Sequence, residues 1–136
     1  MCICYSQSNQ FIKQLPYDIL AIGNHELYIY NNTLDMYTDF APHWNGRYLS
    51  SNANITVPIT DLSETDPSNV KNTSVPVGSR YAKFSTPMGR RVTSLGVLFN
   101  FTGNDEGTTV QPVEEMVKEQ WVRVPSFLSL ISDFGH

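Results

Sequence analysis

Residues 17–28 read Tyr-Asp-Ile-Leu-Ala-Ile-Gly-Asn-His-Glu-Leu-Tyr and pass from one pattern to another. The apolar run within residues 18–22 lies between a proline and Gly23, which indicates a buried strand. Over residues 26–40 the apolar side chains recur every three or four positions, which predicts an amphipathic helix. We expect Pro42 to stop this helix, because a proline ring disrupts a helix interior.

Three polar side chains, Asn24, His25 and Glu26, occupy the turn between the expected strand and the expected helix. In an open α/β sheet, ligands bind beyond the carboxyl ends of the strands, and Gly23 allows a positive φ or a close backbone approach there. Hydrolysis of a phosphoester at a two-metal centre needs metal ligands and a proton for the departing alkoxide. An asparagine oxygen and a histidine can supply these two functions.

The same turn also has a simpler interpretation. Gly-Asn is common in turns, asparagine caps helices well, and a histidine that follows it can simply be exposed. Glu26 lies in the first turn of the expected helix, where a carboxylate interacts favourably with the helix dipole, so a capping role explains it without chemistry. The four residues by themselves leave both interpretations open.

Residues 23–26, Gly-Asn-His-Glu, resemble the third signature block of the calcineurin-like metallophosphoesterases, which follows a hydrophobic strand. Family members of the 5′-nucleotidase type continue with a helix and a strand ending in a Leu-Ser-Ala-Asn-like segment. Residues 48–55, Tyr-Leu-Ser-Ser-Asn-Ala-Asn-Ile, are similar to that segment, and residues 91–99 are similar to a later strand rich in valine and glycine. Over most of residues 10–122 the chain looks most like the secreted 5′-nucleotidase-like phosphoesterases of fungi.

The resemblance implies a hydrolase that uses two divalent metal ions, Mn, Zn or Fe, to cleave small phosphomonoesters such as nucleotides. It implies that Asn24 is a ligand of the second metal ion and that His25 is the catalytic residue facing the leaving group. His136 follows a possible strand at residues 127–131 and would correspond to one of the later histidine ligands. The implied fold class is α/β, a metallophosphoesterase sandwich with a mixed sheet and flanking helices.

The chain departs from the family pattern upstream of the turn. The family's Asp-x-His and Gly-Asp-x-x-Asp blocks precede Gly-Asn-His, whereas residues 1–22 contain one acidic residue, Asp18, and no histidine. We therefore expect residues 1–136 to form a single partial domain, incomplete at both ends, that does not hydrolyse phosphoesters efficiently by itself. The alternative is a non-catalytic remnant or an exported glycoprotein fragment.

Alternation and turn residues predict the remaining elements. Residues 58–79 are rich in Pro, Ser, Thr and Asn, which predicts an exposed loop or insertion. Strands at 80–86 and 90–99 should form a hairpin around Pro87-Met88-Gly89. The other expected segments are a helix at 6–15, a strand at 48–52 paired with 55–57, a loop at 101–109, and a helix at 113–121 that packs Met116, Val117, Gln120 and Trp121 on the sheet.

Glycosylation sequons begin at Asn31, Asn54, Asn72 and Asn100. Their density favours an exported ancestor, although a chain rich in Ser, Thr and Asn also produces sequons by accident. Residues 1–5 have neither the basic start nor the apolar stretch of a signal peptide, and no segment is long enough for a membrane span. We expect a full-length relative to be secreted, vacuolar or extracellular, and the localisation of this chain stays open.

The formal net charge of −4 does not favour binding to nucleic acid. Four basic side chains near the expected hairpin could contact phosphate oxygens, although alternation along the strands would scatter them over both faces. They are Arg80, Lys83, Arg90 and Arg91. His43 and Trp44 are expected to be a surface and a core residue respectively, rather than parts of a substrate pocket.

Overall fold

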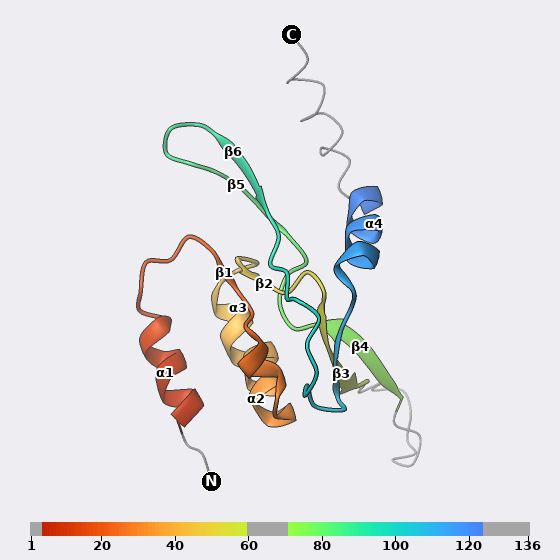
Figure 1. Ribbon diagram of the computed structural model, residues 1–136. Helices are drawn as coiled ribbons and strands as arrows, with labels where there is room; N and C mark the ends of the chain where they lie inside the picture. The colour runs from red at the N-terminus through yellow and green to blue at the C-terminus, as the bar shows by residue number, and fades with distance from the viewer. Residues whose placement is uncertain (1–3, 60–70, 124–136) are drawn as a thin grey trace.

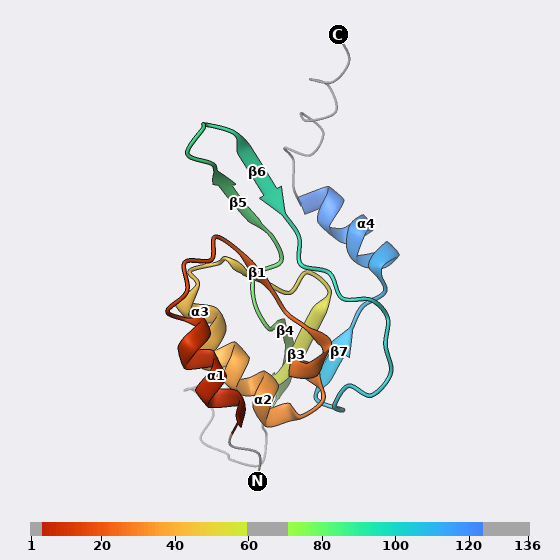
Figure 2. The ribbon, with the colours of Figure 1, turned by 60° about the vertical axis from the view of Figure 1, so that its left-hand side comes forward.

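The computed structural model describes residues 4–59 and 71–123. Its elements in chain order are α1 (Cys4–Ile12), β1 (Leu20–Ala21), the 3₁₀ turn η1 (Asn24–Leu27), α2 (Tyr30–Asp35), the π segment η2 (Met36–Phe40), α3 (Ala41–His43), β2 (Tyr48–Leu49), β3 (Ala53–Pro58), β4 (Asn72–Pro76), β5 (Ala82–Ser85), β6 (Arg91–Ser94), β7 (Thr108–Val110) and α4 (Val113–Arg123). Helices α1, α2 and α3 lie together, and α4 lies on the opposite side of the strands (Figures 1 and 2). The mixture of helices and strands agrees with the expected α/β class.

Within the described ranges the strands form three small sheets. Strand β1 pairs in parallel with β2, with Leu20 opposite Tyr48. Strand β3 lies between β4 and β7 and is antiparallel to both. The expected pairing of 48–52 with 55–57 is therefore wrong. Between β2 and β3 the chain turns into a buried polar segment, residues 50–52, that bonds to other loops instead of continuing a strand.

The expected helix at residues 26–40 is a composite of short segments that continues past Pro42, so the prediction that Pro42 stops it is wrong. In η2 the N–H of Ala41 bonds to the carbonyl of Met36, five residues back, which widens the turn just before the proline. Pro42 then lies in the first turn of α3, where a missing N–H costs little.

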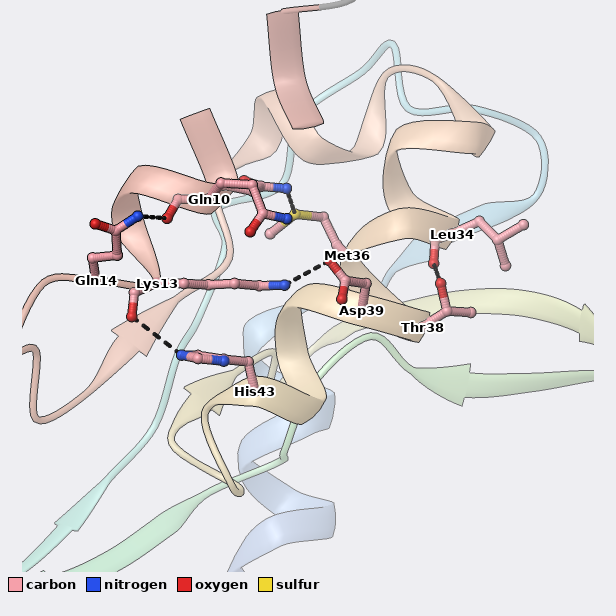
Figure 3. A network of polar contacts seen from close by, with 9 residues as sticks. Gln10, Lys13, Gln14, Leu34, Met36, Thr38, Asp39 and His43 are labelled. Atoms are coloured by element: carbon pink, nitrogen blue, oxygen red, sulfur yellow. Dashed lines mark hydrogen bonds and ion pairs between the residues drawn. The ribbon is translucent and has the colours of Figure 1, made fainter. Parts of the chain in front are cut away.

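Helix α1 packs against this composite helix through polar contacts (Figure 3). The Lys13 ammonium lies 2.6 Å from the Asp39 carboxylate, and the Asn9 amide donates to the Met36 sulfur at 3.4 Å. The ring of His43 lies within hydrogen-bond distance of the Lys13 carbonyl. These contacts fix α1 and the residue that follows it beside η2 and α3. The predicted helix at 6–15 is confirmed in position, with α1 ending at Ile12.

The apolar core joins β1, the composite helix and the β3 sheet. Its buried members are Ile22, Leu27, Met36, Phe40, Trp44, Tyr48, Ala53, Ile55, Val77 and Leu98. His43 is exposed and Trp44 is buried, as the sequence predicts. None of the described helices is long and apolar enough to cross a membrane.

Part of the expected loop at 58–79 is a strand. Residues 72–76 form β4 and pair with β3 from Asn72 opposite Pro58 to Pro76 opposite Asn54. Val77, which follows, is 1% exposed and belongs to the core. The polar composition conceals this strand because much of β4 is exposed or half-buried and so needs few apolar residues. Residues 60–70 lie outside the described ranges.

The hairpin and the last helix follow the sequence prediction. Strands β5 and β6 pair antiparallel and extend away from the other sheets (Figures 1 and 2). Gly89 takes a φ of 78° in the turn, a value that favours glycine. Strand β6 ends at Ser94, earlier than expected. In α4, Met116 is 1% exposed and packs as expected, whereas Val117 is 41% exposed and does not. The side chains of Gln120 and Trp121 lie outside the described part.

Candidate functional site

The polar turn lies at the carboxyl end of β1, as the sequence predicts. The Ile22 N–H continues the parallel pairing by donating to the Leu49 carbonyl at 2.9 Å, and η1 begins two residues later. Gly23 is extended, with φ of −98° and ψ of 170°, so the expected positive φ is not used. A Cβ on Gly23 would lie 2.7 Å from the Glu26 carboxylate, so the chain itself approaches this glycine closely, and the expected approach of a ligand stays a prediction.

The turn is fixed from behind by the buried residue Leu27, which is 0% exposed. Its carbonyl accepts a hydrogen bond from the Asp105 N–H at 2.8 Å and a longer one from the Thr108 hydroxyl at 3.4 Å. The Thr33 hydroxyl, also 0% exposed, donates to the Glu26 carbonyl. Segments far apart in the sequence therefore fix the backbone that presents Asn24 and His25.

Asn24 is held by its own helix turn. Its amide Nδ2 donates to the hydroxyl of Tyr28 at 2.6 Å. That bond uses the nitrogen of the amide and leaves Oδ1 for another donor or a cation. His25 is exposed, and its ring lies 5.1 Å from the Tyr28 ring at an interplanar angle of 56°. Tyr28 therefore contacts both Asn24 and His25, the two site residues predicted from the sequence.

A row of aromatic rings continues from His25 across the surface. The Tyr28 ring meets Phe101 edge-on at 5.9 Å, and Phe101 meets Phe99 at 5.7 Å. Tyr28 is 39% exposed and Phe99 is 62% exposed. We call Tyr28, Phe101 and Phe99 the aromatic shelf. The sequence analysis missed it, although two phenylalanines in the loop after β6 could have indicated an exposed aromatic surface.

Glu26 faces the interior and not the exposed side of the turn. Its Oε2 atom is buried, and it has no hydrogen-bond partner within the described residues. With Asn9, Met36 and Tyr48 it lines a cavity of about 110 Å³. Burial, and secondarily the negative charge of Glu26, raise the pKa of Tyr48 far above its usual value. Glu26 therefore does not have the role expected from the sequence, a carboxylate that caps an exposed helix end.

The donor set in the described part of the chain does not fit a two-metal centre. No three His, Cys, Asp or Glu side chains within it lie close enough to hold a metal ion. Asn24 offers a neutral oxygen, the Glu26 carboxylate faces inward, and His136 lies outside the described residues. We therefore derive no metal-dependent step from this chain alone.

Two of the four basic residues near the hairpin contact other protein groups. The Arg80 guanidinium donates to the Ser51 carbonyl at 2.9 Å and to Asn54 Oδ1 at 2.6 Å. The Lys83 ammonium lies 5.6 Å from the Tyr81 ring centroid. Arg90 and Arg91 are exposed at the hairpin, which extends away from the polar turn (Figure 2). These positions do not bring the four cations to a common phosphate site.

The sequon asparagines differ in accessibility. Asn31, Asn72 and Asn100 are exposed. Asn54 lies in the central strand β3, is half-buried, and accepts the hydrogen bond from Arg80. Attachment of a glycan at Asn54 would have to break that contact, so the exposed three are the better candidates.

Comparison with known proteins finds relatives that are much longer than this chain. No protein-family model matches it. It is 42% identical over 117 residues to an uncharacterized protein of Schizosaccharomyces pombe, covering 84% of this chain and 17% of that protein. It is 34% identical over 133 residues to a protein of Arthroderma benhamiae named "Secreted protein", covering 95% and 18%. An uncharacterized protein of Saccharomyces cerevisiae is 30% identical over 140 residues, covering 96% and 21%. The chain thus spans about a fifth of these relatives.

Among solved structures, the chain is similar to the crystal structure of a 5′-nucleotidase from Candida albicans. The TM-score is 0.68 at 37% sequence identity, and the match covers 85% of this chain and 20% of that one. The expected fold class is confirmed: the chain has an α/β fold that corresponds to part of a 5′-nucleotidase structure.

Proposed function

We propose that this chain forms one edge of the catalytic centre of a calcineurin-like metallophosphoesterase that hydrolyses nucleotide-like phosphomonoesters. The observation that carries the proposal is the position of Asn24 and His25. They lie side by side at the carboxyl end of β1, in a fold similar to part of a 5′-nucleotidase. Ligands of open α/β sheets bind at that edge.

Each residue has a separate proposed role. Asn24 presents Oδ1, because the bond from Nδ2 to Tyr28 fixes the amide. His25 is exposed beside it, and its proposed role is to give a proton to the departing alkoxide. In a complete centre Asn24 would be one ligand of a divalent ion, and the metal ions would supply activation of water and neutralisation of phosphoryl charge. The remaining metal ligands belong to polypeptide other than the described residues, and we propose that the isolated chain is inactive.

A chimera tests this proposal in a complete protein. Residues 10–122 of this chain replace the structurally aligned segment of the Candida albicans 5′-nucleotidase, and phosphate release from AMP is measured. We expect an active chimera in which His25→Ala lowers kcat by roughly 10²- to 10⁴-fold, the range of general acid catalysis. His43→Ala is the matched control, since His43 is another exposed histidine and lies on α3.

Two results would contradict the proposal. An active chimera that tolerates both Asn24→Ala and His25→Ala would exclude the polar turn from catalysis. Steady turnover of p-nitrophenyl phosphate by the isolated 136-residue chain would show that the missing ligands are not needed. The second result would also contradict the sequence-based expectation of an inactive chain.

Export with glycosylation is a second, compatible proposal for the longer protein. A relative bears the name "Secreted protein", and the asparagines of three sequons are exposed. Expression of the chain behind a yeast secretion signal, followed by endoglycosidase treatment, tests it. We expect a mobility shift that decreases stepwise when Asn31, Asn72 and Asn100 are changed to Gln. A secreted chain whose mobility does not change would mean that the sequons carry no glycans and arise only from the composition of the chain.

A further inference from the structure

We propose that Tyr28 is a positioning residue, which holds Asn24 and His25 in one arrangement and is itself held by Phe101. This role rests on the proposed function, because Tyr28 acts through the two residues of the polar turn. It also extends the functional centre to the loop after β6, which is far from the turn in the sequence.

Asn24, His25 and Tyr28 lie on the same side of a short helical turn. The turn η1 runs from Asn24 to Leu27, and Tyr28 continues it with φ of −76° and ψ of −24°. Residues three and four positions apart are neighbours on a helical surface, so the Tyr28 side chain reaches both earlier residues. Ile29 is extended, with φ of −133° and ψ of 122°. Tyr28 is therefore the last residue that the turn offers for these contacts.

The hydroxyl and the ring of Tyr28 contact different residues. The hydroxyl accepts a hydrogen bond from Asn24 Nδ2 at 2.6 Å, which decides which way the oxygen and the nitrogen of this amide point. The ring lies 5.1 Å from the His25 ring and occupies space that the imidazole would otherwise sample. Such placement matters for catalysis, since a group displaced by about 1 Å can lose about 10²-fold in rate. One side chain therefore orients both the amide and the imidazole.

The loop after β6 holds Tyr28 in turn. Phe101 meets the Tyr28 ring edge-on at 5.9 Å, with an interplanar angle of 75°. Phe101 is half-buried and packs against the apolar core, whereas Phe99 is 62% exposed. The Asp105 N–H donates to the Leu27 carbonyl at 2.8 Å, which attaches the same loop to the backbone next to Tyr28. The core thus reaches the polar turn through Phe101 and Tyr28.

Tyr28 itself is not part of the core. It is 39% exposed, so loss of its hydroxyl should leave the fold intact. If Tyr28 served the fold alone, Tyr28→Phe would change neither the amide of Asn24 nor turnover. A positioning role instead predicts a selective effect on Asn24, because the variant keeps the ring beside His25.

NMR spectra of the isotopically labelled 136-residue chain test these contacts without turnover. Tyr28→Phe should shift the side-chain amide signals of Asn24 and leave the ring signals of His25 nearly unchanged, whereas Tyr28→Ala should shift both. Phe101→Leu, which keeps an apolar side chain at the half-buried position, should also shift both. Tyr81→Phe is the matched control, because Tyr81 is 36% exposed and precedes β5 in the hairpin.

The chimera described above separates positioning from contact with the substrate. Tyr28→Phe should lower kcat for AMP by about 2- to 10-fold, the equivalent of one hydrogen bond, and leave KM within about twofold. Phe101→Leu should likewise lower kcat and not raise KM. Tyr81→Phe should change neither constant.

Unchanged Asn24 amide signals in Tyr28→Phe would overturn the inference, and so would equal shifts in Tyr81→Phe. An unchanged kcat with a raised KM would also overturn it, because Tyr28 would then contact the substrate directly. An inactive chimera would count against the proposed function, and the Asn24 and His25 signals of the chain would then decide the positioning role by themselves.

Discussion

Replacement of Asn52 by alanine should destabilise the chain more than any substitution in the polar turn. Asn52 is 1% exposed. Its Nδ2 donates to the Leu98 carbonyl at 2.8 Å and to the Gln111 carbonyl at 2.9 Å, and its Oδ1 accepts the Leu98 N–H at 2.9 Å. One side chain thus joins the β2–β3 connection, the loop after β6 and the segment before α4.

The magnitude follows from the groups left behind. Asn52→Ala removes the partner of two carbonyls and one N–H, and each buried unpaired group costs about 1 to 3 kcal/mol. Because the Gln111 carbonyl is partly buried and water can replace its partner, the two Leu98 groups remain, and we expect a loss of about 2 to 6 kcal/mol. That is a large fraction of the roughly 5 to 15 kcal/mol that stabilises a typical domain.

Urea denaturation followed by circular dichroism measures the loss. With a slope of about 2 kcal/mol per molar, the midpoint should fall by about 1 to 3 M. Asn100→Ala is the control, because Asn100 is exposed in the same loop, and it should change stability by less than about 0.5 kcal/mol. A loss below about 1 kcal/mol for Asn52→Ala, with the slope unchanged, would refute the reasoning.

Two other substitutions probe the packing of Tyr48 and Gly96, and Gly89→Ala in the hairpin turn serves as a comparison. Burial and the charge of Glu26 raise the pKa of Tyr48 in the folded chain. The contribution of the neutral Tyr48 side chain to stability is therefore complete below the unfolded pKa of about 10 and is lost as the pH rises above it. Between pH 7 and 11 the Tm should fall less steeply for Tyr48→Phe than for wild type, and parallel curves of Tm against pH would contradict this. A Cβ on Gly96 would lie 2.6 Å from the Leu49 Cβ, so Gly96→Ala should cost about 1 to 3 kcal/mol. Equal Tm values for wild type and Gly96→Ala would show that β2 moves away freely. At Gly89 an added Cβ would meet open space, but φ is 78°, so Gly89→Ala should cost about 1 to 2 kcal/mol through backbone strain alone.

Local sequence patterns predicted the elements that depend on local interactions. The strand, turn and helix around Asn24 follow from apolar spacing and from Gly23. The hairpin at Gly89 and helix α4 follow from turn chemistry and from helical spacing. In each case neighbouring residues supply most of the determining contacts, so a window of ten to fifteen positions contains the necessary information.

Features that depend on distant partners were not predictable in this way. Strand β4 is recognisable through its pairing with β3, and nothing within residues 72–76 alone excludes a loop. The continuation of the helix past Pro42 depends on a widened turn at η2. The inward orientation of Glu26 depends on the cavity that it shares with Tyr48. The aromatic shelf forms because a loop about 75 residues away bonds to the Leu27 carbonyl.

The way the polar turn is held affects how an inactive chain should be interpreted. The backbone on either side of Glu26 is fixed by Thr33, Asp105 and Thr108, none of which depends on a metal ion for its contact. The amide of Asn24 is fixed by Tyr28. The contacts that fix the turn are thus all made by groups of the described protein chain. Absence of turnover by the chain would point to absent ligands and not to a disordered turn, and for this reason the chimera, which restores the ligands, is the decisive measurement.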